Sequence, residues 1–460
     1  MTGWPVRSLA VLVAGTLFMQ NLDGTIVATA APSMARSFHV GSTQIGICVT
    51  AYLVTVAALI PVSAWVADRW GARKAFLAAI AVFTGASALC ALSTSLLELS
   101  LMRVLQGAGG AMMAPIGRLV VLNSTDKRDI IRAIAYLTWP GLLAPVVAPA
   151  IGGLLTTYAS WHWIFLINLP LGVIALTVAF RMMPTVVTTD PGRLDWVGFV
   201  GAAVALSTLI IVAAMLGAPR INWVDVAVLA LVSVVSGALV TVHLLQDLHP
   251  LVRLDALRVR TFRSAQAGGG LFRIGINAVP FLVPLLFQDQ FGWTPAHAGA
   301  VLLFLFVGNL AVKPLTTPLL RTFGFRTVMI WTTAGAVLSV AACALLHGST
   351  SVVVIAAVVL VSGVFRSIGY TCYNTIAFAD IDQPTMNQAN TLASTIQQLT
   401  QALGVALGVV ALKAARPLVG VGREYQFAFV VLAVVIGFAA IGALRLPSSA
   451  GESIREGTRS

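Results

Sequence analysis

The chain has 460 residues, of which 58% are hydrophobic and only 10% are charged. Soluble proteins carry charge on about a quarter of their residues, so this composition excludes a soluble enzyme and indicates a polytopic membrane protein. The formal net charge of +12 comes mostly from Lys and Arg residues in short connectors between apolar runs, which indicates membrane topology rather than nucleic-acid binding.

Fourteen apolar runs are long enough to cross a bilayer as helices, since a crossing takes about 20 residues. In chain order we predict spans at 8–31, 44–65, 75–93, 97–122, 130–157, 162–180, 195–216, 224–243, 263–287, 297–319, 327–346, 351–378, 388–412 and 425–445. Without the seventh and eighth, twelve would remain. The basic residues concentrate in alternate connectors, which predicts that both termini are cytoplasmic.

Two connectors share a pattern: ADRWGARKAF at 67–76 and LRTFGFRTVM at 320–329 both place an aromatic residue, Gly, one residue and Arg between helices. If they correspond, the first and last six spans are related halves, as in one large class of transporters. The predicted segments are an N-terminal six-helix bundle at 1–181, two inserted helices at 182–245, a cytoplasmic connector at 246–262, a C-terminal six-helix bundle at 263–445 and a cytoplasmic tail at 446–460.

The first span contains Asp23, the only acidic residue well inside a predicted span. A charge at the bilayer centre costs at least about 2.5 kcal/mol, so this carboxylate needs a cavity or a partner. We predict that Asp23 faces a polar cavity and couples transport to protons, with Arg103 of the fourth span at a compatible depth for pairing. The alternative is a structural acid that bonds Thr25 or a neighbouring helix.

Five motifs follow one another within the first 172 residues: LDGTIV (22–27), SAWVADRWGARK (63–74), RVLQGAGGAMMAP (103–115), PGLLAPVVAPAIGG (140–153) and SWHWIFLINLPLG (160–172). Together they resemble the major facilitator superfamily. The first and last resemble its fourteen-span drug:proton antiporter branch of the EmrB/QacA type, including the MdtD/HsrA-like members. The resemblance implies an all-α major facilitator fold, two six-helix bundles plus two extra central helices, and a proton-driven exporter in the cytoplasmic membrane of a bacterium.

The resemblance also implies a conformational latch at the SAWVADRWGARK motif. Asp68 would pair with an arginine such as Arg118 and cap the start of the thirteenth span, where a carboxylate is electrostatically favourable. Arg69, Gly71 and Arg73 would complete the latch.

The fifth span supplies candidate hinge and packing positions. Small residues let helices approach closely, and prolines each remove a backbone hydrogen bond. The predicted positions are Gly141, Pro145, Pro149, Gly152 and Gly153. The antiporter motif usually has Gly before its prolines, whereas this chain has Ala144 and Ala148.

The second half places Arg273, Lys313 and Arg366 inside spans that have no acid at their middle. Such cations would make a positive cavity suited to an anionic substrate, unless they pair with Asp23 or with backbone carbonyls. The predicted cavity residues are Gln20, Asn21, Gln106, Trp139, Arg273, Asn277, Lys313, Arg366, Tyr370, Asn374 and Gln398.

The sequence therefore predicts a proton-coupled, multidrug-type exporter of small organic compounds that works by alternating access. The alternative is an exporter of an anionic metabolite or metal–carboxylate chelate. A remote alternative, a membrane-embedded enzyme, would need a His or acid cluster at one membrane face, and none is visible in the sequence. We expect no enzymatic activity, cofactor, metal or nucleic-acid partner. The expected partners are a small-molecule substrate, protons and the bilayer, and the expected state is a monomer, with an envelope-spanning partner left open.

Overall fold

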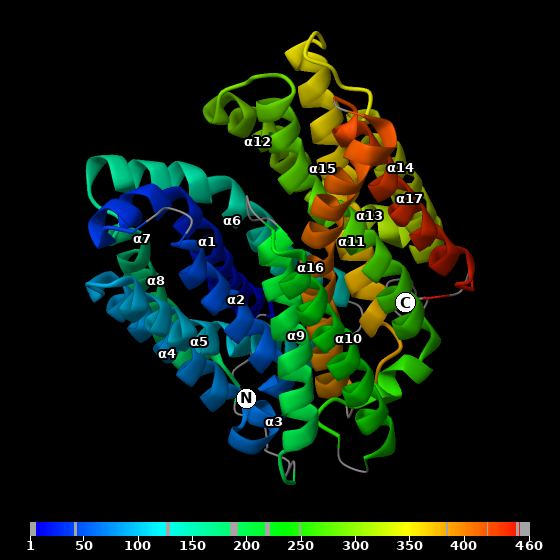
Figure 1. Cartoon of the computed structure of the whole chain (residues 1–460). Helices are drawn as coiled ribbons and strands as arrows, with labels where there is room; N and C mark the ends of the chain where they lie inside the picture. The colour runs from blue at the N-terminus through cyan, green and yellow to red at the C-terminus, as the bar shows by residue number, and fades with distance from the viewer. Residues whose placement is uncertain are drawn as a thin grey trace.

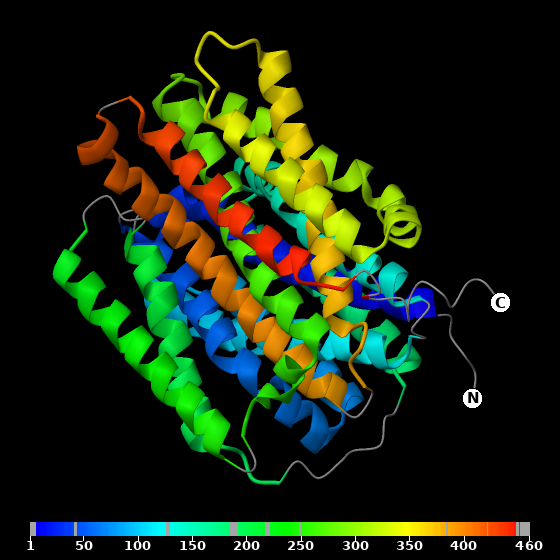
Figure 2. The same ribbon diagram turned by 90° about the vertical axis from the view of Figure 1, so that its right-hand side faces the viewer.

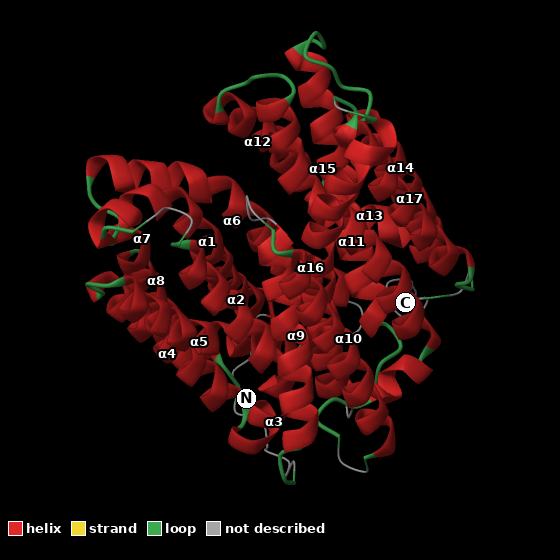
Figure 3. Cartoon of the chain, in the orientation of Figure 1, coloured by secondary structure: helices red, strands yellow, loops and turns green. Residues whose placement is uncertain are grey.

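The computed structural model describes residues 6–40, 44–125, 129–184, 192–216, 221–247, 250–382, 385–420, 422–447 and 450. Within these residues the regular structure is helical, and Figure 3 shows no strand among them. The all-α fold class is therefore confirmed. Twelve of the described helices are long and apolar enough to cross a membrane, or thirteen if one bent pair counts as a single span. The count of fourteen spans stays a prediction.

The first half of the chain forms one bundle. Its helices are α1 (Val6–Phe38), α2 (Gly46–Leu59), α3 (Ser63–Trp70), α4 (Ala72–Leu92), α5 (Leu96–Asn123), α6 (Ile130–Tyr158), α7 (Trp163–Leu166) and α8 (Asn168–Met182). A short 3-10 turn, η1 (Ile60–Val62), separates α2 from α3 at Pro61, which lacks the N–H that an unbroken helix needs. Helix α1 packs along α6, and α4 packs along α5.

The second half forms another bundle, entered through η3 (Leu254–Arg258). Its helices are α11 (Arg260–Asp289), α12 (Pro295–Ala311), α13 (Lys313–Phe323), α14 (Phe325–Cys343), α15 (Val352–Phe378), α16 (Met386–Val419) and α17 (Glu424–Leu444). The axes of α12 and α13 differ by 47°. In Figure 1 the two bundles lie close together near α3 and diverge toward the opposite end, where α12 and α15 stand.

Two additional helices, α9 (Trp196–Leu216) and α10 (Trp223–Gln246), form a hairpin between the halves in sequence. Figure 2 shows this hairpin in green at the edge of the molecule, beside α16 in orange. Helix α9 contacts α2 of the first bundle and α16 of the second, so it covers one of the two seams between them. Helix α10 packs mainly on α9 and exposes many large apolar side chains, as a lipid-facing helix does.

The two connectors with the shared sequence pattern have similar backbone geometry. Gly71, between α3 and α4, has φ 83° and ψ 136°, and Gly324, between α13 and α14, has φ 76° and ψ 160°. Both torsions lie in a region that residues with a side chain rarely adopt. Each turn also follows a broken span, α2–α3 in one half and α12–α13 in the other.

Candidate functional site

Asp23 lies in the middle of α1 and is only 1% exposed. Arg103 Nη1 of α5 lies 2.5 Å from Asp23 Oδ2, and the two side chains form a fully buried ion pair. The other oxygen, Oδ1, accepts hydrogen bonds from Gln106 Nε2 at 2.9 Å and Asn168 Nδ2 at 2.8 Å. The carboxylate is thus surrounded by donors from α5 and α8 of its own bundle.

The prediction that Asp23 faces a polar cavity does not match this structure, because its carboxylate points into the closed interior of the first bundle. The reason is helical rotation. Asn21, two residues earlier, does face the central cavity described below. Two residues correspond to about 200° around a helix, so Asp23 lies on the opposite face of α1.

The network around this ion pair contains groups that the sequence analysis did not identify. Ser87 Oγ accepts from Gln106 Nε2 at 2.7 Å and from Asn168 Nδ2 at 3.3 Å. The Tyr52 ring lies under the Arg103 guanidinium, with 4.1 Å between Cζ and the ring centroid. Asn168 was detectable, since it belongs to the SWHWIFLINLPLG motif. Ser87 and Tyr52 have no comparable sequence signal.

The network is not fully satisfied among the described residues. Arg103 Nε and Nη2 are buried without a hydrogen-bond partner, as is Asn168 Oδ1. A buried ion pair is costly to desolvate, and unmatched polar atoms add to that cost. This arrangement is therefore poorly explained by stability alone.

Near the end of α3, Asp68 Oδ1 accepts a hydrogen bond of 2.5 Å from Asn387 Nδ2, in the first turn of α16. Asp68 therefore contacts the start of the helix that the resemblance pointed to. Arg118 does not pair with it here; Arg118 Nη2 instead donates to Gln397 Oε1 at 3.3 Å, farther along α16. Arg73 Nη2 donates to Phe180 O of α8 at 2.6 Å, and Arg69 is exposed.

A cavity of about 260 Å³ lies between the two halves. Its walls come from α1, α2, η1, α5 and α6 on one side and from α11, α15 and α16 on the other. Seven of the predicted cavity residues line it: Gln20, Asn21, Asn277, Arg366, Tyr370, Asn374 and Gln398. Arg118 also lines it, and the described residues of the lining include no acid. The wall is thus positively charged and rich in side-chain amides.

The remaining predicted cavity residues lie elsewhere. Gln106 belongs to the network around Asp23. Arg273 is buried beside the cavity, where its Nη2 donates to Asn374 Oδ1 at 2.8 Å. Lys313 lies on a different cavity, and its Nζ donates to Thr371 Oγ1 at 2.9 Å. The side chain of Trp139 lies outside the described residues.

Arg366 is held by α11 rather than by an acid. Its Nη1 donates to the backbone oxygen of Ile276 at 2.9 Å, and its Nη2 donates to Asn277 Oδ1 at 3.3 Å. Tyr370 Oη donates to the same Asn277 oxygen at 2.5 Å. Backbone pairing, one of the alternatives for this cation, therefore occurs, while the guanidinium still lines the cavity.

Of the hinge and packing positions on α6, two can be placed. A Cβ on Gly152 would lie 2.1 Å from Thr29 Oγ1, so α1 and α6 approach too closely there for any larger residue. Gly153 has nothing within 4 Å of such a Cβ and does not make a close approach. The packing around Gly141, Pro145 and Pro149 lies outside what the structure describes.

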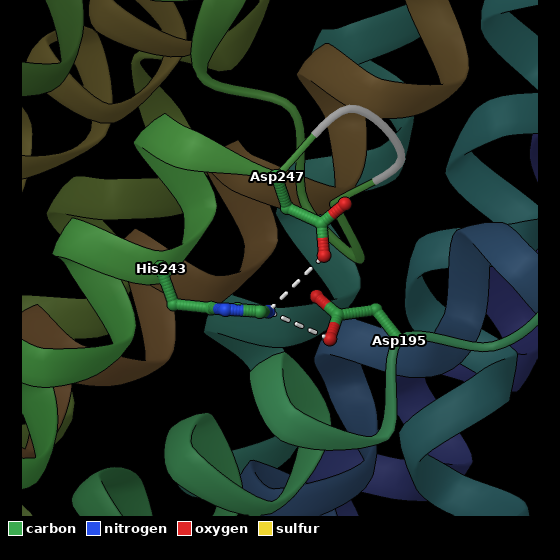
Figure 4. A group of neighbouring side chains, drawn as sticks. All are labelled: Asp195, His243 and Asp247. Carbon is green, nitrogen blue, oxygen red and sulfur yellow. Dashed lines mark hydrogen bonds and ion pairs between the residues drawn. The ribbon is translucent and has the colours of Figure 1, made fainter.

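The structure brings together a His and two acids at one end of the added hairpin, a cluster that sequence inspection did not reveal (Figure 4). His243 Nε2 lies 2.9 Å from Asp195 Oδ1 and 3.4 Å from Asp247 Oδ2. Asp195 Oδ1 also accepts from Gly198 N at 2.7 Å, and its Oδ2 accepts from Leu251 N at 3.1 Å. Asp195 therefore caps α9 and ties the connector to it.

These contacts explain the acidity of Asp195. Burial raises the pKa of this carboxyl, but the hydrogen bonds from Gly198 N, Leu251 N and His243 outweigh it. The pKa of Asp195 consequently lies below its ordinary value of 3.8. Since backbone N–H groups occupy both oxygens, we interpret the cluster as a structural tether rather than an open metal or catalytic site.

Comparisons with known proteins agree with this architecture. A family model described as Major Facilitator Superfamily matches residues 13–405 and 267–459. The putative multidrug resistance protein MdtD of Escherichia coli O6:H1 is 37% identical over 402 residues, covering 86% of this chain and 84% of that protein. The MdtD protein of Pectobacterium atrosepticum is 37% identical over 403 residues, covering 87% and 86%.

Two solved structures share the fold. The human organic anion transporter MFSD10 (TETRAN) gives a TM-score of 0.71 at 12% identity, covering 96% of this chain and 100% of that one. The proton:xylose symporter XylE gives 0.67 at 12% identity, covering 98% of each chain. At this identity the two likenesses show the fold alone.

Proposed function

This chain belongs to the major facilitator superfamily, and we propose that it is a proton-coupled exporter of small organic compounds that works by alternating access. It is a transporter and a multi-pass membrane protein, and its curated bacterial relatives are named putative multidrug resistance proteins. The substrate class follows the relatives named for multidrug resistance. The coupling site is the part argued from this chain.

One observation supports the coupling proposal: the buried Asp23–Arg103 pair lies close to the central cavity but is closed off from it. Gln20 lines the cavity, and the Tyr52 ring packs against the Arg103 guanidinium. A Cβ built on Gly110 would lie 3.1 Å from Tyr52 Oη and 3.5 Å from Gln20 Nε2, so both side chains end at the same glycine. Tyr52 and Gln20 thus separate the ion pair from the cavity by one layer of polar side chains.

The chemistry follows from the charges. Protonation of Asp23 would neutralise it and remove its Coulombic attraction to Arg103. Arg103 would then be a buried cation without a counter-ion, which is strongly unfavourable. A shift of α1 against α5 that hydrates Arg103 from the cavity would relieve this cost. Proton binding and helix movement would in this way be coupled.

We further propose the topology predicted from the sequence: both termini in the cytoplasm, a monomer, and α9–α10 with their flanks (182–245) inserted between bundles at 1–181 and 263–445. The segments 246–262 and 446–460 would be a cytoplasmic connector and tail. With this orientation, the Asp68–Asn387 contact closes the cytoplasmic end, and the bundles diverge toward the outside (Figure 1). The conformation seen here would be outward-facing.

The decisive experiment measures proton-gradient-driven transport of tetraphenylphosphonium into proteoliposomes by wild type and Asp23→Asn. We expect Asp23→Asn to abolish accumulation driven by the gradient. The matched control is Glu98→Gln, which removes an acid from the same bundle but keeps a side chain able to cap α5. Undiminished, gradient-driven transport by folded Asp23→Asn would remove Asp23 from the coupling role.

A second candidate substrate class has its own support. Among the described residues of the cavity wall, the charged ones are Arg118 and Arg366, and none is an acid that would attract a lipophilic cation. An anionic metabolite or metal–carboxylate chelate fits this wall better. Binding of citrate, with and without a chelated metal ion, should be compared with binding of tetraphenylphosphonium in wild type and Arg366→Gln. Loss of citrate binding alone in the variant would favour the anionic class.

A further inference from the structure

The wall that the second bundle gives to the central cavity carries several side-chain amides. Asn277 of α11, Asn374 of α15 and Gln397 of α16 are among them. An amide side chain can present either its carbonyl oxygen, an acceptor, or its NH2 group, a donor. What this wall recognises therefore depends on which end of each amide is left for a ligand.

Two of these amides take part in a reciprocal arrangement between α11 and α15. Arg366 Nη2 of α15 donates to Asn277 Oδ1 of α11 at 3.3 Å, and Arg273 Nη2 of α11 donates to Asn374 Oδ1 of α15 at 2.8 Å. Arg273 and Asn277 are four residues apart and so share one face of α11. Asn374 follows Arg366 by eight residues, about two turns, on one side of α15. Each helix thus supplies an arginine that holds an amide of the other.

The third amide is held across the interface between the bundles, where Arg118 Nη2 of α5 donates to Gln397 Oε1 of α16 at 3.3 Å. A guanidinium has only donors, so an amide that contacts one must turn its oxygen toward it. The NH2 groups of the three amides then remain, and none of them has a protein acceptor among the described residues. These amides therefore offer donors to a ligand, while their oxygens are already bonded to arginines.

Arg273 differs from the other two arginines, because it does not line the cavity and is only 2% exposed. Its Nη1 donates to Gln266 Oε1 at 3.4 Å, and its Nε is buried without a hydrogen-bond partner among the described residues. A buried guanidinium with an unsatisfied donor is costly, so stability gives little reason for an arginine here. Its connection to the cavity is the bond to Asn374, which it orients without reaching a ligand itself.

We propose that the arginine–amide pairs make the central cavity selective for ligands that present several acceptor oxygens, such as carboxylates, and that Arg273 is the positioning residue for Asn374. This inference rests on the proposed function, since it takes the central cavity as the substrate site. Oxygens of the ligand accept from the NH2 groups of the three amides and from the cavity-lining guanidinium groups. A ligand that brings N–H groups to the same places meets donors with donors, which costs affinity.

The test measures equilibrium binding of citrate and of tetraphenylphosphonium to the full-length protein in detergent, by isothermal titration calorimetry. We expect wild type to bind citrate. Asn374→Leu removes one donor to a charged acceptor and should bind citrate about tenfold more weakly, which corresponds to about 1.4 kcal/mol. Tetraphenylphosphonium has no acceptor oxygen, so the same variant should bind it as tightly as wild type.

A double-mutant cycle tests whether Arg273 acts through Asn374. Arg273→Met should weaken citrate binding about tenfold more in wild type than in the Asn374→Leu background, because only the loss of a distant charge remains once the amide is gone. Arg273→Lys keeps a charge and a donor for Asn374 Oδ1 and should bind citrate within about threefold of wild type. Equal weakening by Arg273→Met in both backgrounds would overturn the positioning role.

The matched control is Gln288→Leu, which removes a half-buried amide of α11 that does not line the cavity and should bind citrate like wild type. If Arg273→Met or Asn374→Leu does not fold, Asn374→Asp serves instead, since it keeps an oxygen for Arg273 but replaces the donor with an acceptor. It should bind citrate at least about tenfold more weakly, and undiminished binding would overturn the proposal.

Wild type that does not bind citrate would also overturn the proposed selectivity. The proton-coupling proposal would be unaffected by that result, because it is tested separately by gradient-driven transport of tetraphenylphosphonium.

Discussion

Asn168 donates a hydrogen bond of 2.8 Å to Asp23 across 145 positions of sequence. The two residues belong to the LDGTIV and SWHWIFLINLPLG motifs, so the signatures at both ends of the first bundle meet at one buried carboxylate. Their joint occurrence in the chain thus has a structural basis. The bond also makes Asn168 a sensitive probe of the state of Asp23.

We predict that Asn168→Asp is more damaging than Asn168→Ala. The alanine removes one donor to a buried carboxylate, at a cost of about 1–3 kcal/mol. The aspartate is nearly isosteric but places a second acid beside Asp23, so the two cannot both ionise without strong repulsion. Thermal unfolding in detergent at neutral pH should rank wild type above Asn168→Ala, and Asn168→Ala above Asn168→Asp. Equal unfolding temperatures for the two variants would contradict the expected repulsion between the two acids.

The Asp23–Arg103 pair should behave as a unit. Removing one member leaves a buried charge unmatched, and such changes cost about 3–5 kcal/mol. Arg103→Gln should therefore express poorly or unfold early, whereas Asp23→Asn/Arg103→Gln should recover much of the loss because neither charge remains. A double-mutant cycle on thermal stability measures this coupling. Additive losses in the double variant would contradict a direct interaction.

The Asp23–Arg103 pair should also be required for proton-coupled transport. A variant that folds but does not couple would separate this role from the effect of the pair on stability. The double variant Asp23→Asn/Arg103→Gln is expected to fold yet to show no accumulation driven by a proton gradient. Counterflow exchange of substrate, which needs no gradient, should persist in the same proteoliposomes. Loss of both activities would point to a damaged cavity rather than to lost coupling.

The contact between Asp68 and Asn387 should control the balance between conformations. Asn387→Ala and Asp68→Ala break the same bond, so both should shift the population by a similar amount, roughly tenfold for a charge-assisted hydrogen bond worth about 1.5 kcal/mol. Distances between spin labels on the cytoplasmic ends of α3 and α16 would report the shift. Lys74→Ala, at an exposed residue near the start of α4, is the control and should leave the distances unchanged. Opposite responses in the two latch variants would show that the contact does not close this end.

The sequence predicted the architecture well because apolar length and charge placement are strong signals for membrane helices. It also put Asp23 and Arg103 at matching depths, and the structure pairs them. It could not predict which face of α1 carries Asp23, because the apolar residues of a membrane helix surround it and leave no amphipathic pattern to orient it. Arg118 was assigned to Asp68 from a family pattern, whereas in this structure it contacts α16 within the central cavity.

Side chains brought together by long-range packing were beyond sequence reasoning. Ser87 and Tyr52 are common residue types in apolar runs, and only the packing of α2, α4 and α5 places them around Arg103. Asp195 and His243 are 48 positions apart, and only the α9–α10 hairpin brings them into contact. Asn387 lies in the first turn of α16, and its contact with Asp68 depends on the approach of α3 to α16.

The Asp195 tether gives a prediction with a defined pH dependence. The folded-state pKa of Asp195 is depressed, so its contribution is present above its ordinary value of 3.8 and is lost as the pH falls through the folded-state pKa. Asp195→Asn keeps one acceptor oxygen and loses the charge, which should cost about 1–2 kcal/mol at pH 6. The deficit relative to wild type should shrink steadily at pH values below 3.8. Hydrogen exchange at the Leu251 amide, which bonds Asp195, reports the tether locally and should quicken in the variant at pH 6. Asp247→Asn is the matched control. It removes the other acid near His243, which lies 3.4 Å away, but keeps Asp195 and its bond to the Leu251 amide, so that amide should stay protected. If exchange at the Leu251 amide were the same in wild type and Asp195→Asn, the Asp195 carboxylate would not hold the connector, and the tether would be disproved.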